Sequence, residues 1–546
     1  MLFRTTIKRL PTILWSWVEP NLRLFLTTRQ PALWLLAILV GSAIAGAAIL
    51  FRLAIGLFQL PWLGTMAETV VTSSAGLHWL IVLLSPAVGG LLVGLYLTYV
   101  QPNKRSGGVA DVIEARARGG RGLKLGTGLG SALVTAISLG SGASAGREGP
   151  VVHLGATLST VICEFFRLPD NARRILLACG VASAVSASFN APIAGALFAH
   201  EVILGHYAMS AFVPIVIASA AGTLFSRLWF GDVAAFAIPN YQITSYLEIP
   251  AFALLGLTCA AVAVLFQFAL IGADWFARNI SMPLWLRPVI GGLIVGAIGL
   301  VFPHVLGVGY EATDQALKHE LSITLMLSLL VAKTVATAIT LASRFGGGIF
   351  SPSLYLGAMT GGAFGLIAAS AFPELASSEG LYAILGMGAV AASTLGAPIS
   401  TVMIVFELTG GYALSIALLL TVSMSVGLTQ AVHGRSFFHW QLETRGIVLG
   451  DGPHQWLVRE VKVAEFMTKP GEDDEPEQLD PEAETPHLTK DDTLEKALRL
   501  FDDTGASSLP VVAGPGDTAI IGRAQHVHAL RYFNSALIEA NVEEHR

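Results

Sequence analysis

The chain has 546 residues, of which 53% are hydrophobic and only 13% are charged, and its mean hydropathy is +0.64. Soluble proteins carry roughly 25% charged residues, so the composition excludes a soluble globular enzyme and predicts an all-α polytopic membrane protein. The formal net charge of −5 says little about the membrane part, because acidic residues crowd the C-terminal tail.

Basic residues flank the first two apolar runs. Residues 1–30 form a basic, amphipathic start before the run at 32–50, and a second basic group lies at 104–124, after the run at 78–100. Each run has about the 20 residues that span hydrocarbon. The positive-inside rule places both basic groups in the cytoplasm. We therefore predict a multi-pass protein of the cell (inner) membrane, with both termini cytoplasmic and 1–30 as an N-terminal segment.

The stretch LGSGASAGREGPVVHLGA, residues 139–156, puts an arginine and a glutamate into a glycine-rich break between two apolar runs. Gly149-Pro150 opens the second run, and proline favours the first turn of a helix. Glu148 is therefore expected at a helix N-terminus, where unpaired N–H groups attract anions. A tethered carboxylate can occupy such a site and leave it when protonated or displaced, so we predict that Glu148 is a gate.

Other interpretations of this stretch are weaker. GASAG, residues 142–146, fits the G-x-S-x-G pattern of serine hydrolases, but that motif needs a soluble sheet with histidine and aspartate partners. The alternative for Glu148 is a charge paired with Arg147 in a loop at the membrane edge. Ionisable residues inside membrane segments are rare and usually functional, which favours a functional role. We predict no enzyme activity, no metal site and no nucleic-acid partner.

An internal repeat organises the apolar part of the chain. APIAGALFAHEV, residues 191–202, aligns without a gap with APISTVMIVFEL, residues 397–408, so that Glu201 matches Glu407. Each copy follows a glycine-rich break that contains a proline: GREGP in the first, GGGIFSP in the second. Paired broken helices are typical of transport proteins with a site between two related halves. The shared position of the two glutamates favours a structural role such as helix capping, although one of them could carry protons.

GREGP, FNAPIAG-x-LF-x-x-E, GGGIFSP and VFELT, in this order, resemble the CLC family of chloride channels and proton/chloride antiporters. The resemblance covers about residues 31–445. It implies a homodimer in the lipid bilayer, with one pore per subunit and two inverted half-repeats, about 31–230 and 250–432. The transported ligands are then chloride and other small anions, and Glu148 is the external gating glutamate. The resemblance assigns anion binding to the following residues: Ser106, Gly107, Gly108, Arg147, Gly149, Gly348, Ile349, Phe350 and Phe438.

Two departures weaken the anion site that the family pattern implies. The family's G-S-G-I-P-E matches SGGVAD here, so the coordinating serine falls on Gly107, with Ser106 one place away. Phe438 in GRSFFHW stands where the family usually has a tyrosine. Glycine and phenylalanine side chains cannot donate hydrogen bonds. A weak central site favours fast passage over tight binding.

The third departure concerns protons. Proton-coupled members often have a second glutamate after the residue that matches Glu201, and this chain has Val202 there. Valine cannot carry a proton, so we predict a passive, voltage-gated-type chloride channel gated by Glu148. The alternative is a proton/chloride antiporter in which Glu201, His200 or water replaces the missing relay.

The C-terminal residues 456–546 resemble a small α/β CBS domain, with an acidic insertion at 471–487. We predict a helix at 491–501, strands at 507–512 and 520–521, and a closing helix at 526–536. One repeat is present, so pairing is expected across the dimer. Nucleotide-binding repeats often end in Ser/Thr-x-x-Asp, where this chain has Gln525 and His528. We therefore expect a structural role and no cofactor, and keep as a further alternative a sensor that does not conduct.

Overall fold

In the computed structural model, the chain divides into two compact units, one of residues 1–207 with 211–440 and one of 441–546 with Ala208–Ser210. The structure describes residues 30–231, 243–409, 414–447, 461–468, 486–514 and 516–545, together with Glu19, Phe236, Val458, Gln478 and Leu479. The predicted N-terminal segment and nearly all of the acidic insertion lie outside the described residues. Within the described part, eight helices are long and apolar enough to cross a membrane.

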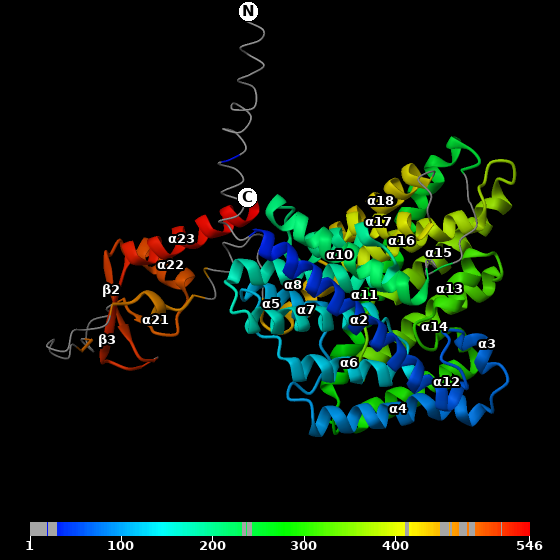
Figure 1. The fold of residues 1–546 in the computed structure, drawn as a ribbon, viewed down its shortest axis with the longest axis horizontal. Coiled ribbons are helices and arrows are strands. Elements are labelled where there is room, and N and C mark those ends of the chain that lie inside the picture. The colour runs from blue at the N-terminus through cyan, green and yellow to red at the C-terminus, as the bar shows by residue number, and fades with distance from the viewer. Residues whose placement is uncertain are drawn as a thin grey trace, which may run out of the picture. The chain divides into compact units, whose positions relative to one another are not determined.

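The first half of the larger unit is all helical, as Figure 1 shows in blue to green. Its elements are α2 (Gln30–Leu63), α3 (Val70–Ser74), α4 (Trp79–Tyr99), α5 (Val109–Ala117), α6 (Leu125–Gly140), α7 (Glu148–Phe165), α8 (Asp170–Phe189), α9 (Pro192–Phe198), the π-helix η1 (Ala199–Leu204) and α10 (Met209–Phe230).

The second half repeats this order of long and short helices. Its elements are η2 (Tyr246–Glu248), α11 (Ile249–Asn279), α12 (Leu286–Val301), η3 (Pro303–Val305), α13 (Tyr310–Leu317), α14 (Ile323–Ala342), α15 (Phe350–Ala371), α16 (Glu379–Leu395), α17 (Pro398–Thr409), α18 (Ser415–His433) and α19 (Phe437–Glu443). The first series of helices runs from α2 to α10 and the second from α11 to α18.

The packing of α4 against α12 shows that the halves are inverted. A Cβ at Gly90 would lie 2.2 Å from the carbonyl oxygen of Pro288, and a Cβ at Gly292 would lie 2.3 Å from that of Pro86. Each helix thus has a glycine where the backbone of the other comes close. Residue 86 of α4 lies near residue 292 of α12, and residue 90 lies near residue 288, so the two helices run antiparallel. Small residues allow such close approach where no hydrophobic effect drives helices together. The inverted repeat implied by the sequence is confirmed.

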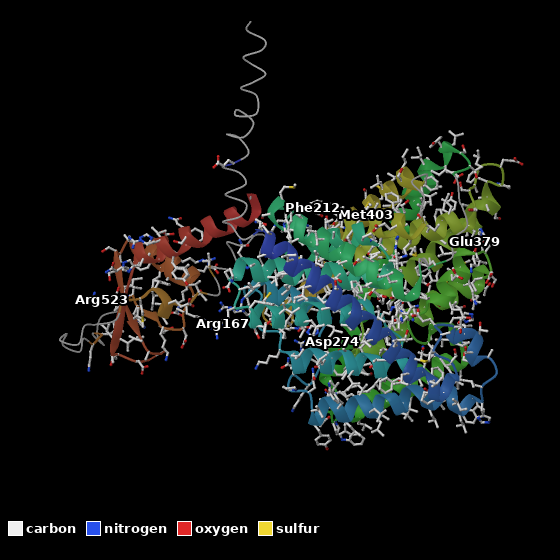
Figure 2. The ribbon with its side chains drawn as sticks, in the orientation of Figure 1. Arg167, Phe212, Asp274, Glu379, Met403 and Arg523 are labelled. Carbon is white, nitrogen blue, oxygen red and sulfur yellow. The ribbon has the colours of Figure 1, made fainter. Side chains whose placement is uncertain are left out.

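The outer faces of the helices are apolar. Large side chains such as Leu35, Leu50 and Trp229 are exposed there, and carbon dominates the sticks around the bundle in Figure 2. An apolar exterior over many helices suits contact with lipid. The larger unit is therefore a membrane domain.

The smaller unit is an α/β fold with a three-stranded sheet in the order β1-β2-β3. β1 (Leu488–Thr489) pairs parallel with β2 (Ser508–Val512), and β2 pairs antiparallel with β3 (Ile520–Gln525), which carries Arg523 (Figure 2). The helices are α21 (Val463–Phe466), α22 (Leu494–Thr504) and α23 (His526–His545). The four elements predicted from the sequence are present, and α21 and β1 are additional.

Candidate functional site

The two glycine-rich breaks meet at the centre of the membrane unit. Gly146 and Gly348 exchange backbone hydrogen bonds, each with an N···O distance of 2.7 Å. A Cβ at Gly146 would lie 2.9 Å from Oε2 of Glu148 and 3.0 Å from the amide nitrogen of Ser351. The two breaks therefore pair through the backbones of two glycines, and this pairing brings the N-termini of α7 and α15 together.

Glu148 begins α7 and lies at this meeting point, with only 1% of its surface exposed. Its Oε1 accepts a hydrogen bond of 2.6 Å from the hydroxyl of Tyr310, and its Oε2 accepts one of 2.5 Å from the hydroxyl of Ser351. These donors come from α13 and α15 of the second half, whereas the glutamate comes from the first. A carboxylate of the first half thus accepts hydrogen bonds from two hydroxyls of the second half.

Arg147 lies beside Glu148 and makes its closest ion pair with Glu68. Its guanidinium makes an ion pair and a hydrogen bond with Glu68, which is also bound by Arg52 at 2.9 Å. Its Nε lies 3.8 Å from Oε1 of Glu148, and its Cζ lies 4.9 Å from the centre of the Tyr310 ring. Burial raises the pKa of Glu68, but the charges of Arg147 and Arg52 outweigh this effect and lower it. Glu68 therefore holds the arginine more closely than Glu148 does.

The predicted anion residues around the gate are brought together by the fold. Cα of Gly348 lies 3.5 Å from the position of a Cβ at Gly149, and Ile349 and Phe350 open α15. The Phe350 ring contacts Phe189 and Phe198, with ring centres 5.0 and 6.0 Å apart. Phe438 is buried on α19, but no hydrogen bond or ring contact joins it to Glu148 among the residues that the structure describes.

Gly107 and His153 lie against each other in the wall of a polar cavity. A Cβ at Gly107 would lie 2.2 Å from Nε2 of the His153 ring, which α7 carries. The cavity has a volume of about 260 Å³ and is also lined by Arg105 and Ser131, and the Ser131 hydroxyl accepts a hydrogen bond from the Gly107 amide at 2.9 Å. Ser106 precedes this glycine, and Gly108 caps α5 with its amide on Asp111. The imidazole therefore fills the space that a side chain at position 107 would need.

Glu201 caps the start of a helix in the second half, and Glu407 caps the start of a helix in the first half. The carboxylate of Glu201 accepts hydrogen bonds from the amides of Ile399 (2.9 Å) and Ser400 (2.7 Å), at the start of α17. Equivalently, Glu407 accepts from the amides of Ile193 (2.9 Å) and Ala194 (2.7 Å), at the start of α9. Unpaired amides at a helix start need acceptors, so these hydrogen bonds confirm the structural interpretation.

These caps lead to a prediction about stability. Glu407→Gln is expected to destabilise the protein by about 1–3 kcal/mol, because an amide offers one acceptor atom where the carboxylate offers two. Glu201→Gln should cost a similar amount by symmetry. The thermal midpoint of purified protein in detergent measures both effects. The control is Thr258→Val on α11, since the Thr258 hydroxyl bonds only to a carbonyl of its own helix. A midpoint equal to that of the control would contradict the capping role.

His200 and Val202 lie with Glu201 on η1. His200 is fully buried, and its Nδ1 lies 2.9 Å from the carbonyl oxygen of His206. Its Nε2 has no hydrogen-bond partner among the described residues. The His200 ring also stacks on Tyr207 and Phe212, with ring centres 5.6 and 5.9 Å apart. Both Glu201 oxygens accept hydrogen bonds, whereas Nε2 of His200 makes none within the described part of the chain.

Sequence reasoning missed the two residues that donate hydrogen bonds to Glu148. Ser351 lies inside GGGIFSP, and its place just before Pro352 was a usable signal. Tyr310 follows Gly309 at the start of a short helix, 162 positions from Glu148. No spacing in the sequence connects it with the gate. His153 was missed because a single histidine in an apolar run is more often a core residue.

The sequence matches a known family model. Residues 89–430 match the model described as voltage gated chloride channel. A putative chloride channel protein, ClcB-like, from Ralstonia nicotianae is 33% identical over 386 residues, which cover 70% of this chain and 90% of that protein. The H(+)/Cl(-) exchange transporter ClcA of Cronobacter sakazakii is 32% identical over 308 residues, 55% of this chain and 66% of that one.

The fold is shared with a solved structure. A slow cyanobacterial Cl-/H+ antiporter superposes with a TM-score of 0.67 at 23% identity, covering 76% of this chain and 97% of that one. At this identity the likeness concerns the fold.

Proposed function

Because the chain belongs to the voltage gated chloride channel family, we propose that it carries chloride across a membrane in exchange for protons, with Glu148 as the gate and proton acceptor. The observation that carries this proposal is the buried carboxylate of Glu148, held by the hydroxyls of Tyr310 and Ser351. Hydroxyls that bind a carboxylate can also bind chloride. The two hydroxyls bind the carboxylate most strongly when it is charged, and protonation removes that charge. Glu148 would then leave the site, so one group couples proton uptake to the opening of the path.

Proton exchange rather than passive flow is supported from two sides. One relative is named as an exchange transporter, and the solved neighbour is titled an antiporter. The chain also offers a replacement for the missing relay, because His200 is buried with Nε2 not hydrogen-bonded within the described residues. We propose His200 as the internal proton group, in place of the glutamate that Val202 replaces.

The second candidate is the passive channel predicted from the sequence. Val202 favours it, since an apolar side chain on η1 cannot carry a proton. A relative named as a putative chloride channel is consistent with it. The two candidates share the gate and differ only in whether protons move against the chloride flow.

One experiment separates them. Purified protein in liposomes receives a chloride gradient, the voltage is clamped with valinomycin and potassium, and chloride and external pH are followed together. We expect protons to move uphill, driven by chloride. His200→Gln is expected to slow proton movement at least about tenfold while chloride still flows, because glutamine cannot exchange a proton. Chloride flux without proton movement in the unmodified protein would establish the channel instead. A lack of any chloride flux would contradict both.

The assembly follows from the same family membership. We propose a homodimer in the inner membrane with one path per subunit, and cytoplasmic termini on the grounds of the basic loops. The small α/β unit is proposed as a CBS-like domain with a structural role. Its core is built from apolar side chains such as Val463, Phe501 and Val511.

A further inference from the structure

Lys333 is an ionisable side chain buried inside the membrane unit, on α14, with 0% of its surface exposed. No carboxylate lies within ion-pair distance of its nitrogen among the described residues. Placing an ionisable group in this setting is costly, and such groups are usually functional. Neither the gate nor the proposed proton path uses Lys333.

Two hydrogen bonds and one aromatic ring surround the amino group of Lys333. Nζ donates to the carbonyl oxygens of Val305 and Gly307, both at 3.0 Å, and lies 5.2 Å from the centre of the Tyr355 ring. Two carbonyl oxygens and one aromatic face suit an ammonium group. Lys333 therefore ties α14 to two other segments, the connector 302–309 and helix α15.

Both of these segments hold the gate. The connector leads through Gly309 into α13, whose first residue, Tyr310, donates to Glu148. Tyr355 stands one helical turn after Ser351, the second donor to Glu148. After the short helix η3, the connector turns through Gly307 (φ 64°) and Gly309 (φ 93°), and the Gly307 amide donates to the carbonyl oxygen of Gly142 at 3.2 Å. Lys333 therefore contacts the connector that leads to Tyr310 and the helix that carries Ser351.

We propose that Lys333 is a positioning residue of the gate, which clamps the 302–309 connector against α15 so that Tyr310 and Ser351 hold the carboxylate of Glu148 in the closed position. This inference rests on the proposed function of Glu148. The charged and titratable groups that face Glu148 are Tyr310 from α13 and Arg147 from its own break, with Glu68 and Arg52 behind the arginine. Tyr355 is the titratable side chain that faces Lys333 in the described part of the chain.

The pH profile of chloride flux tests the clamp. In Lys333→Met, Tyr310 holds the ionised carboxylate less well, so protonation and opening need less acid. The external pH of half-maximal flux is expected to rise by about one unit, since hydrogen bonds to the charged form favour that form. Tyr310→Phe is expected to shift it in the same direction. The double variant should shift it by less than the sum of the two single shifts, because part of the effect of Lys333 passes through Tyr310. The control is Thr334→Val, whose hydroxyl bonds only to its own helix.

The design keeps folding apart from function. Lys333→Gln is made in parallel, because it keeps a polar group if the methionine variant does not fold, and a smaller shift in the same direction is expected. An unshifted midpoint in whichever variant folds would overturn the clamp, as would additive shifts with Tyr310→Phe. Glu148→Ala, assayed beside them, reports on the gate itself. A pH profile that survives in that variant refutes the gate, whereas a lost profile together with an unshifted Lys333 variant refutes only the clamp.

Discussion

Glu148→Ala is expected to give chloride flux that no longer depends on external pH and that is no longer coupled to protons. The carboxylate fills the site between α7 and α15, held by two hydroxyls. Alanine leaves that site open and has no group to protonate. Each lost hydrogen bond to a charged group is worth about 1.5–3 kcal/mol, so flux at neutral pH should rise at least about tenfold.

Flux from liposomes at several external pH values measures this effect. Glu148→Gln mimics the protonated state and is expected to behave like the alanine variant. Glu164→Ala is a matched control, because Glu164 lies on the same helix but is exposed. If Glu148→Ala retained the pH profile of the unmodified protein, the gate would have to be sought elsewhere.

Gly107 and His153 give the second large effect. Gly107→Ser alone is expected to disturb the site, because its Cβ would lie 2.2 Å from Nε2 of His153, and overpacking of this kind costs about 1–3 kcal/mol. In the double variant Gly107→Ser with His153→Ala, the hydroxyl has room and adds a donor at the predicted anion site. Chloride should then bind roughly tenfold or more tightly.

Calorimetric titration of chloride into purified protein tests this. His153→Ala alone is the control, and it is not expected to tighten binding, since it makes space without adding a donor. If Gly107→Ser alone folded well and bound chloride as tightly as the double variant, the imidazole would not compete for this space. If the double variant bound no better than the unmodified protein, the predicted place of the anion at Gly107 would be wrong.

Short sequence patterns were enough to predict much of the architecture. Apolar length fixed the membrane class, because hydrocarbon admits only segments whose backbone is internally hydrogen-bonded. The repeat around Glu201 and Glu407 was visible since both halves need the same caps. Glu148 was recognisable because a charge before a helix start in an apolar chain is rare. Each of these signals lies within a short stretch of sequence, where the positions of residues along one helix follow directly from their spacing.

Contacts between distant segments were decided only by the tertiary structure. The inversion of the halves became visible in the register of α4 against α12, since a repeat in sequence has no direction in space. The donors Tyr310 and Ser351 reach Glu148 across the interface of the halves, and Lys333 meets the connector at Val305 through its backbone. Every residue has a backbone carbonyl group, so a contact made to one cannot be predicted from the identity of the residue. The sequence by itself therefore determined the class, the repeat and the place of Glu148 at a helix start, whereas the groups that hold its carboxylate were set by how two halves of one chain pack together.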